Sequence, residues 1–91
     1  MAQLTVDIVA KDRAVWSGAA KVVSAPAADG EIGVLAGHTP ILSVLNAGHV
    51  RVTDLDGVKH DFEITGGFIS VDDNIVSVVA DKVLADTTAS A

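Results

Sequence analysis

Cysteine is absent from this chain of 91 residues. No disulfide, thiolate zinc site or thiol nucleophile can therefore form. Without cysteine, the sequence does not indicate whether the protein resides in an oxidising or a reducing compartment. Aromatic side chains are nearly as rare, because Trp16, Phe62 and Phe68 are the only three. A folded core must then be filled by valine, isoleucine, leucine and alanine, and this bias toward β-branched side chains favours strands.

Basic residues are also scarce. Six Lys and Arg stand against twelve Asp and Glu, which gives a formal net charge of −6 at pH 7. Such a charge repels phosphate backbones and anionic lipid, so direct binding to nucleic acid or to a membrane surface is not expected. The first residues, Met1 to Gln3, lack the basic start and apolar run of a signal peptide, and the expected location is cytoplasmic.

The chain is long enough for one domain, and a domain of this size buries roughly 60 to 65% of the surface of its unfolded chain. Helical periodicity is missing, and glycines and prolines separate short β-branched runs. This pattern predicts an all-β fold, a two-layer antiparallel β-sandwich or flattened barrel of about nine to ten short strands. The predicted domain covers residues 1–83, and residues 84–91 are expected to form a short disordered tail.

The predicted strands follow the runs of Val, Ile and Leu. Leu4, Val6 and Ile8 alternate with polar residues and mark the first strand. A short run ending at Trp16 comes just before a predicted turn at Ser17 and Gly18. The other predicted strands are 21–25, 32–35, 41–45, 48–54, 59–64, 68–71 and 75–79.

The clearest hairpin is centred on residues 55–57, and side-chain parity determines its register. A two-residue turn there would mix apolar and charged side chains on each face. A three-residue loop, with its glycine in the left-handed conformation, pairs Val50 with Phe62 instead. The same register sets Arg51 against Asp61 on the outer face as a cross-strand ion pair. Because only this register separates apolar from charged side chains, it is the one predicted.

One stretch of the chain carries no Asp, Glu, Lys or Arg. It runs from Ile32 to Val50 and is long enough on paper to cross a bilayer. Its glycines, Pro40 and Asn46 would break a helix and carry polar groups into hydrocarbon, so turns between buried strands are predicted. The runs 41–45 and 76–79 are apolar on both faces. In a two-layer sandwich only one face of each strand can be buried in the core. Partner chains are therefore expected to cover the remaining apolar surface.

No recognisable catalytic or metal-binding pattern is present. Three histidines, His38, His49 and His60, stand eleven residues apart and match no metal-ligand spacing. His49 and His60 are expected at the rim of a sheet, and His38 in a turn or an interface, because no nucleophile motif offers it a group to activate. The glycine-rich stretches near Gly30 and Gly66 lack the helix and lysine of a phosphate-binding loop. Neither a cofactor nor a metal is predicted.

One alternative comes from a different class of protein. The tripeptide Asp81-Lys82-Val83 resembles the modified-lysine motif of lipoyl and biotinyl carrier domains, which are also small, acidic and all-β. In such domains the lysine lies at the tip of a mid-chain hairpin, whereas Lys82 is nine residues from the end of this sequence. A carrier domain modified at Lys82 is therefore the second hypothesis.

The order of several short motifs resembles the N-terminal β-sandwich domain of the epsilon subunit of F-type ATP synthases. The most specific block is GEIGVLAGHTP at 30–40, followed at family-like spacing by GHVRV at 48–52 and GGFISV at 66–71. The opening VDIV at 6–9 and WSG at 16–18 fit as well. Each motif is weak alone, but their order extends over most of the chain.

The resemblance implies a non-catalytic rotor subunit at the foot of the central stalk, which passes proton-driven rotation on to ATP synthesis. Its expected partners are the gamma subunit and the ring of c subunits, at the cytoplasmic face of the cell membrane and without direct membrane insertion. By position in the motifs, the expected c-ring contacts are Gly30, Glu31 and Ile32. The positions that match those near gamma are Ala10, His38 and Ser43. An acidic Glu31 would suit the basic loops that c rings typically present.

The chain departs from the family pattern in two places. Ala36 stands where the family usually has proline, which makes the loop less rigid without changing its course. Family members normally continue into a C-terminal hairpin of two helices that restrains ATP hydrolysis and in some bacteria binds ATP. This sequence contains no such hairpin, so it is expected neither to insert into the catalytic head nor to bind nucleotide in that way.

Overall fold

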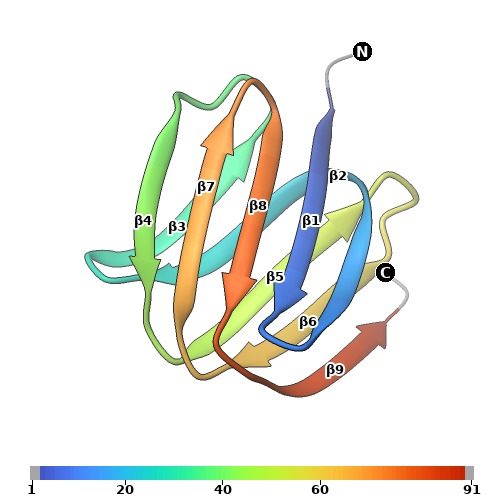
Figure 1. The fold of residues 1–91 in the computed structure, drawn as a ribbon. Helices are drawn as coiled ribbons and strands as arrows, with labels where there is room; N and C mark the ends of the chain where they lie inside the picture. Colours follow the sequence, from blue (N-terminus) through green and yellow to red (C-terminus); the bar gives the residue numbers. More distant parts are fainter. Residues whose placement is uncertain (1–2, 90–91) are drawn as a thin grey trace.

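Residues 3–89 form nine strands and no helix in the computed structural model (Figure 1). The all-β prediction is therefore confirmed. No part of this range is a helix that could cross a membrane. The strands are β1 (Leu4–Ala10), β2 (Arg13–Ala27), β3 (Gly30–Leu35), β4 (Ile41–Leu45), β5 (Gly48–Asp54), β6 (Lys59–Ile64), β7 (Gly67–Asp72), β8 (Ile75–Ala80) and β9 (Val83–Ala89).

The strands stack in two layers, as predicted (Figure 1). One layer has the order β4-β7-β8-β1, and the other has the order β3-β2-β5-β6-β9. The antiparallel prediction is wrong for one pair, because β1 and β8 run in the same direction. Only strands joined by a short hairpin must be antiparallel. Six strands separate β1 from β8 along the chain, so no short connection dictates their relative direction.

Strand β2 belongs to both layers, and it corrects the predicted turn at Ser17 and Gly18. The two residues lie inside this 15-residue strand and pair with β1. A Cβ atom at Gly18 would come within 3.1 Å of the Trp16 ring, so glycine makes room here for an indole. A register shift between Ala20 and Val22 bends the strand where it passes from β1 to β5.

The C-terminal segment is a strand, so the predicted disordered tail is wrong for residues 84–89. Strand β9 pairs with β6 from Val83 to Ala89. Its side chains are largely exposed, and the apolar alternation that marks a strand in sequence is therefore missing. Backbone hydrogen bonds to the edge of β6 need no such alternation. Ser90 and Ala91, which the same prediction covered, lie outside the described residues.

The β5–β6 hairpin has the predicted register. Val50 pairs with Phe62 and Arg51 with Asp61. The loop glycine, Gly57, has a φ of 85°, and the N–H of Asp54 donates to the carbonyl of residue 58 across the loop. Arg51 Nε lies 3.1 Å from Asp61 Oδ2, so the predicted ion pair is present.

The core lies between the two layers and is entirely hydrophobic, since none of the described polar or charged residues is buried. Phe62 is its largest fully buried side chain, and valines and isoleucines from both layers pack around it. The charge-free run becomes β3, β4, the start of β5 and the turns between them. The predicted turns are present, but the prediction that the strands between them are buried is wrong for β3 and β4, in which only Val34 and Leu45 are buried.

Replacing Gly67 by alanine should destabilise the fold strongly. Gly67 has a φ of 149°, and an added Cβ would lie 2.0 Å from the carbonyl oxygen of Val79 on the neighbouring strand. Backbone would have to move, so we expect a loss of about 3 kcal/mol in unfolding free energy, measured by urea denaturation. The matched control is Gly33→Ala, where the Cβ meets nothing within 4 Å, with an expected change within about 0.5 kcal/mol. Equal stability of the two variants would contradict the close strand contact at Gly67.

Candidate docking faces

The outer face of the β4-β7-β8-β1 layer carries a row of apolar side chains, which we call the apolar row. Its members are paired across neighbouring strands: Val44 with Phe68, Phe68 with Val79, and Val79 with Val9. Val44, Phe68 and Val79 are 53%, 52% and 44% exposed, and Leu42 beside them is 77% exposed. Alternate residues of the same strands form the core, so these strands are apolar on both faces, as predicted.

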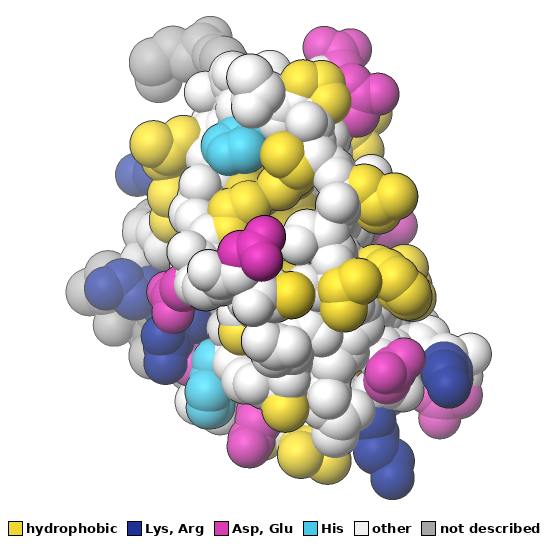
Figure 2. All heavy atoms as spheres, turned by 90° about the vertical axis from the view of Figure 1, so that its left-hand side faces the viewer, with side chains coloured by type: hydrophobic (Ala, Val, Ile, Leu, Met, Phe, Trp, Pro, Cys, Tyr) yellow, Lys and Arg dark blue, Asp and Glu magenta, His cyan; other side chains and the backbone are white. Residues whose placement is uncertain are grey.

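The apolar surface continues around the edge of the molecule where β4 lies. Figure 2 shows this edge: hydrophobic side chains gather at its centre and right, whereas most charged side chains lie at the left and lower margins. A small protein rarely leaves a contiguous apolar surface in water unless another surface covers it. This face therefore has the character of an interface.

A groove of about 540 Å³ lies between β3 and β4. Gly30, Glu31 and Ile32 from the start of β3 line one side, and Ser43 from β4 lines the other. Gly30 and Glu31 are exposed and Ile32 is half-buried. The groove thus brings the three residues expected at the c ring close to one residue expected near gamma.

The other two residues expected near gamma lie apart. His38 is in the β3–β4 loop, which is held to the β7–β8 turn because the N–H of Gly37 donates to Asn74 Oδ1 over 2.7 Å. Ala10 ends β1, at the opposite edge of the layer from β4 (Figure 1). Ala10, His38 and Ser43 therefore surround the layer that carries the apolar row, without forming a cluster.

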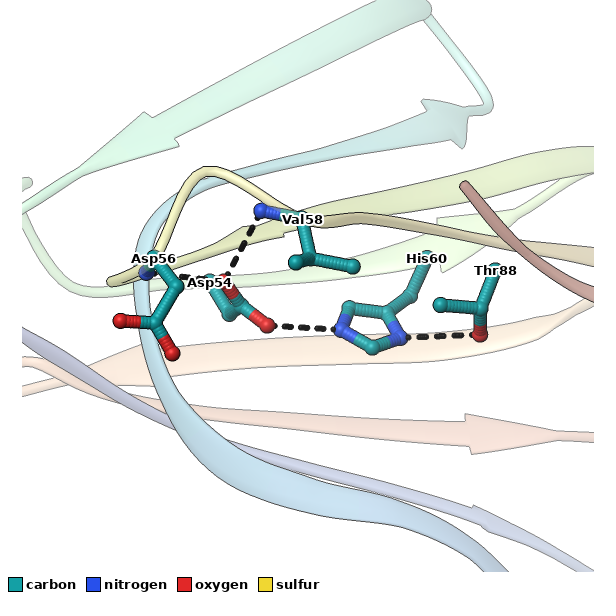
Figure 3. Close-up of polar contacts among 5 residues, drawn as sticks. All are labelled: Asp54, Asp56, Val58, His60 and Thr88. Carbon is teal, nitrogen blue, oxygen red and sulfur yellow. Dashed lines mark hydrogen bonds and ion pairs between the residues drawn. The ribbon is translucent and has the colours of Figure 1, made fainter. Parts of the chain in front are cut away.

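The second layer carries a polar network that the sequence did not reveal. His60 Nε2 lies 3.0 Å from Asp54 Oδ2, and His60 Nδ1 lies 3.2 Å from Thr88 Oγ1 (Figure 3). The imidazole lies against the Trp16 ring, with 4.9 Å between the ring centroids. His60 was expected at a sheet rim, but its side chain is only 12% exposed, whereas that of His49 is 46% exposed.

The order Asp54, His60, Thr88 has the composition of an acid, a base and a hydroxyl nucleophile, but each member has a structural partner. The Asp54 carboxylate also accepts the N–H groups of Asp56 and Val58, which closes the β5–β6 loop. Thr88 lies on β9, so its contact with His60 fastens that strand to β6. Among residues 3–89, no group of three or more His, Asp or Glu side chains is placed to hold a metal ion.

Two carboxylates are more acidic than usual. The hydrogen bond from His60 lowers the pKa of Asp54, and backbone donors at Val58 and Asp56 lower it further against the opposing effect of burial. For Asp61, partial burial by itself would raise the pKa, but hydrogen bonds from His49 and Arg51 outweigh it and leave the pKa below its ordinary value. Both carboxylates are therefore ionised at neutral pH and stabilise the β5–β6 hairpin.

Replacing Asp54 by asparagine should change the acid dependence of stability. Because the pKa of Asp54 is lower in the folded state than the unfolded value of about 3.9, its contribution is present above that pH and is lost as pH falls through the folded pKa. The melting temperature of Asp54→Asn should lie below that of the wild type at pH 7. The gap should close as pH falls below about 4.

Asp56→Asn is the matched control, because Asp56 contributes only its backbone N–H to the network. Its melting temperature should follow that of the wild type at every pH. A gap between wild type and Asp54→Asn that stayed constant down to about pH 3 would contradict the assignment.

A small β-sandwich with a broad apolar sheet face is a docking domain, whose folded surface is completed by another protein. The chain belongs to the family described as "ATP synthase, Delta/Epsilon chain, beta-sandwich domain", which matches residues 3–86.

Relatives of known name support this assignment. The ATP synthase epsilon chain of Micrococcus luteus is 47% identical over 91 residues, covering 99% of this chain and 100% of that protein. That of Rhodococcus jostii is 45% identical, covering 90% of this chain and 68% of that protein. That of Bordetella petrii is 38% identical, covering 92% of this chain and 60% of that protein.

Two ATP synthase structures contain a similar fold. A chain in the Euglena gracilis mitochondrial ATP synthase, solved as its OSCP/F1/c-ring part, has a TM-score of 0.86 at 27% identity and covers 92% of this chain. A chain in the central stalk and c-ring of the Tetrahymena thermophila enzyme has a TM-score of 0.71 at 16% identity, which shows the fold alone. This chain spans 54% and 65% of those two chains.

Proposed function

We propose that this chain is a non-catalytic subunit of the central stalk of an ATP synthase, where it docks on the gamma subunit and the c ring and helps to couple proton-driven rotation to ATP synthesis. The observation that carries the proposal is the apolar row, since it is a surface that requires a protein partner. Relatives named ATP synthase epsilon chain match nearly the whole chain. The location that follows is peripheral, at the cytoplasmic face of the membrane.

The gamma subunit is the partner proposed for the apolar row. The row lies within the layer that Ala10, His38 and Ser43 surround. A protein lying across this layer would cover Phe68 at its centre and approach His38 at its margin. Ser43 and Ala10 alternate with the apolar row and would be reached only at the strand edges. Burial of the exposed valine, leucine and phenylalanine side chains would supply the main favourable free energy of docking.

The c ring is the partner proposed for the start of β3. Glu31 is exposed there and lines the β3–β4 groove. A carboxylate at this place would orient the domain against basic loops and contribute more to specificity than to affinity. Because the groove also contains Ser43, the two proposed contacts are adjacent.

The carrier-domain hypothesis is less well supported. Lys82 lies in the connection between β8 and β9, and those strands pair with β7 and β6 and not with each other. Lys82 is therefore not at the tip of a hairpin, which is the position that a modified lysine requires in such domains.

A charge in the middle of the apolar row should abolish docking on gamma. Phe68→Asp places a carboxylate where the partner would exclude water, so we expect the dissociation constant to rise at least about a hundredfold. The measurement is co-elution with the gamma subunit in gel filtration, followed by calorimetric titration. The fold should persist, because Phe68 is half exposed in the unbound chain.

Leu84→Asp is the matched control, because Leu84 is 58% exposed but lies on β9 in the other layer. Its binding to gamma should stay within about twofold of the wild type. Equal loss of binding in both variants would place the gamma contact elsewhere, and failure of the wild type to co-elute would refute the proposal.

Reversing the charge at Glu31 should weaken docking on the c ring. Glu31→Lys would repel basic loops, so we expect a several-fold loss of binding to the purified c ring, greatest at low salt. Asp72→Lys, at the far end of β7, is the control and should bind as the wild type does. A Glu31→Lys variant that fails to fold, by circular dichroism, would show that Glu31 is structural.

A further inference from the structure

Half of the basic side chains of this chain gather at one end of the sandwich. Of the six Lys and Arg residues, Lys11 lies in the β1–β2 turn, Arg13 begins β2, and Lys82 lies between β8 and β9. The three line one hollow of about 340 Å³. The β1–β2 turn and the β8–β9 connection, which carry them, lie at the lower side of Figure 1. All three are exposed. We call these three residues the basic cluster.

The basic cluster is positive in an otherwise acidic molecule. Its hollow also contains Asp12 and Asp81, so three cations face two carboxylates and leave a net charge of +1, against −6 for the whole chain. The ion pairs within 4 Å among the described residues join His49, Arg51 and His60 to acids, and none involves the cluster. The cations are therefore available to a charged partner.

The basic cluster adjoins the apolar row. Val9, at one end of the row, is two residues before Lys11, and Val79 is three residues before Lys82. The row crosses the layer near the ends of β1 and β8, and both strands lead directly into the cluster. A protein that covers the row at its β1 edge thus comes within reach of all three cations.

We propose that Lys11, Arg13 and Lys82 bind carboxylate side chains of the protein that covers the apolar row. The inference rests on the proposed function, in which that protein is the gamma subunit. A protein is favoured over an anionic membrane because the overall charge of −6 repels an extended negative surface, whereas a few carboxylates beside an apolar patch meet only the local positive charge. The cluster would orient the partner and speed its association.

The three basic residues outside the cluster provide a matched control. Lys11→Gln/Arg13→Gln/Lys82→Gln removes the cluster, and Lys21→Gln/Arg51→Gln/Lys59→Gln removes the others, so both variants have the same net charge. Association with the gamma subunit is measured by stopped-flow fluorescence at about 0.05 M and about 0.5 M NaCl. At low salt the cluster variant should associate about tenfold more slowly than the wild type and the control within about twofold of it. At high salt the difference should nearly vanish.

The outcomes separate the two proposals. Equal rates for the two variants would overturn this inference and leave the proposed function standing, whereas a wild type that does not bind gamma would overturn both. Vesicles of phosphatidylglycerol and phosphatidylcholine are the second probe. Binding to these vesicles that the cluster variant loses would also overturn the inference, because the cations would then serve a membrane.

Discussion

The constraint on which the molecule depends is that one of its two layers is apolar on both faces. Val76, Val78 and Ile69 fill the core, while Phe68 and Val79 on the same strands point outward. A two-layer sandwich can hide only the inner set. After folding, the outer set of apolar side chains is still in contact with water. Association with a second protein can bury this set and so lower the free energy further. The stability of this layer and its binding capacity come from the same strands.

The second layer is built for contact with water. Its outer face carries charged side chains on β5 and β6 beside small residues on β2 and β9, and its ion pair and its histidine–aspartate contacts lie on the β5–β6 hairpin. Asp54 closes the loop of that hairpin, and His60 connects the hairpin to β9 and Trp16. The polar contacts thus maintain the shape of one layer, and the apolar surface of the other remains available. This division explains how so acidic a chain can carry a hydrophobic interface.

Local rules predicted the parts of this fold that depend on neighbours in sequence. Parity and one glycine determined the β5–β6 register, and the apolar runs of β4 and β8 were enough to predict that both faces of these strands are apolar. Contacts between distant residues were not predictable in this way. Gly18 has the sequence context of a turn, although in the fold it makes room for Trp16. Strand β9 forms by backbone pairing that leaves little apolar pattern, and His60 meets Thr88 across 28 residues. The groove between β3 and β4 was likewise not predictable, because these strands belong to different layers and the groove depends on how the layers are placed.

The passage of β2 through both layers has a mechanical consequence. Its first half is hydrogen-bonded to β1 and its second half to β3 and β5. A twisting load applied to one sheet and resisted at the other is therefore carried along a covalent backbone as well as through the packed side chains between them. In a rotating shaft, such a continuous strand makes the domain a stiff link, because the sheets cannot slide past each other without breaking its hydrogen bonds.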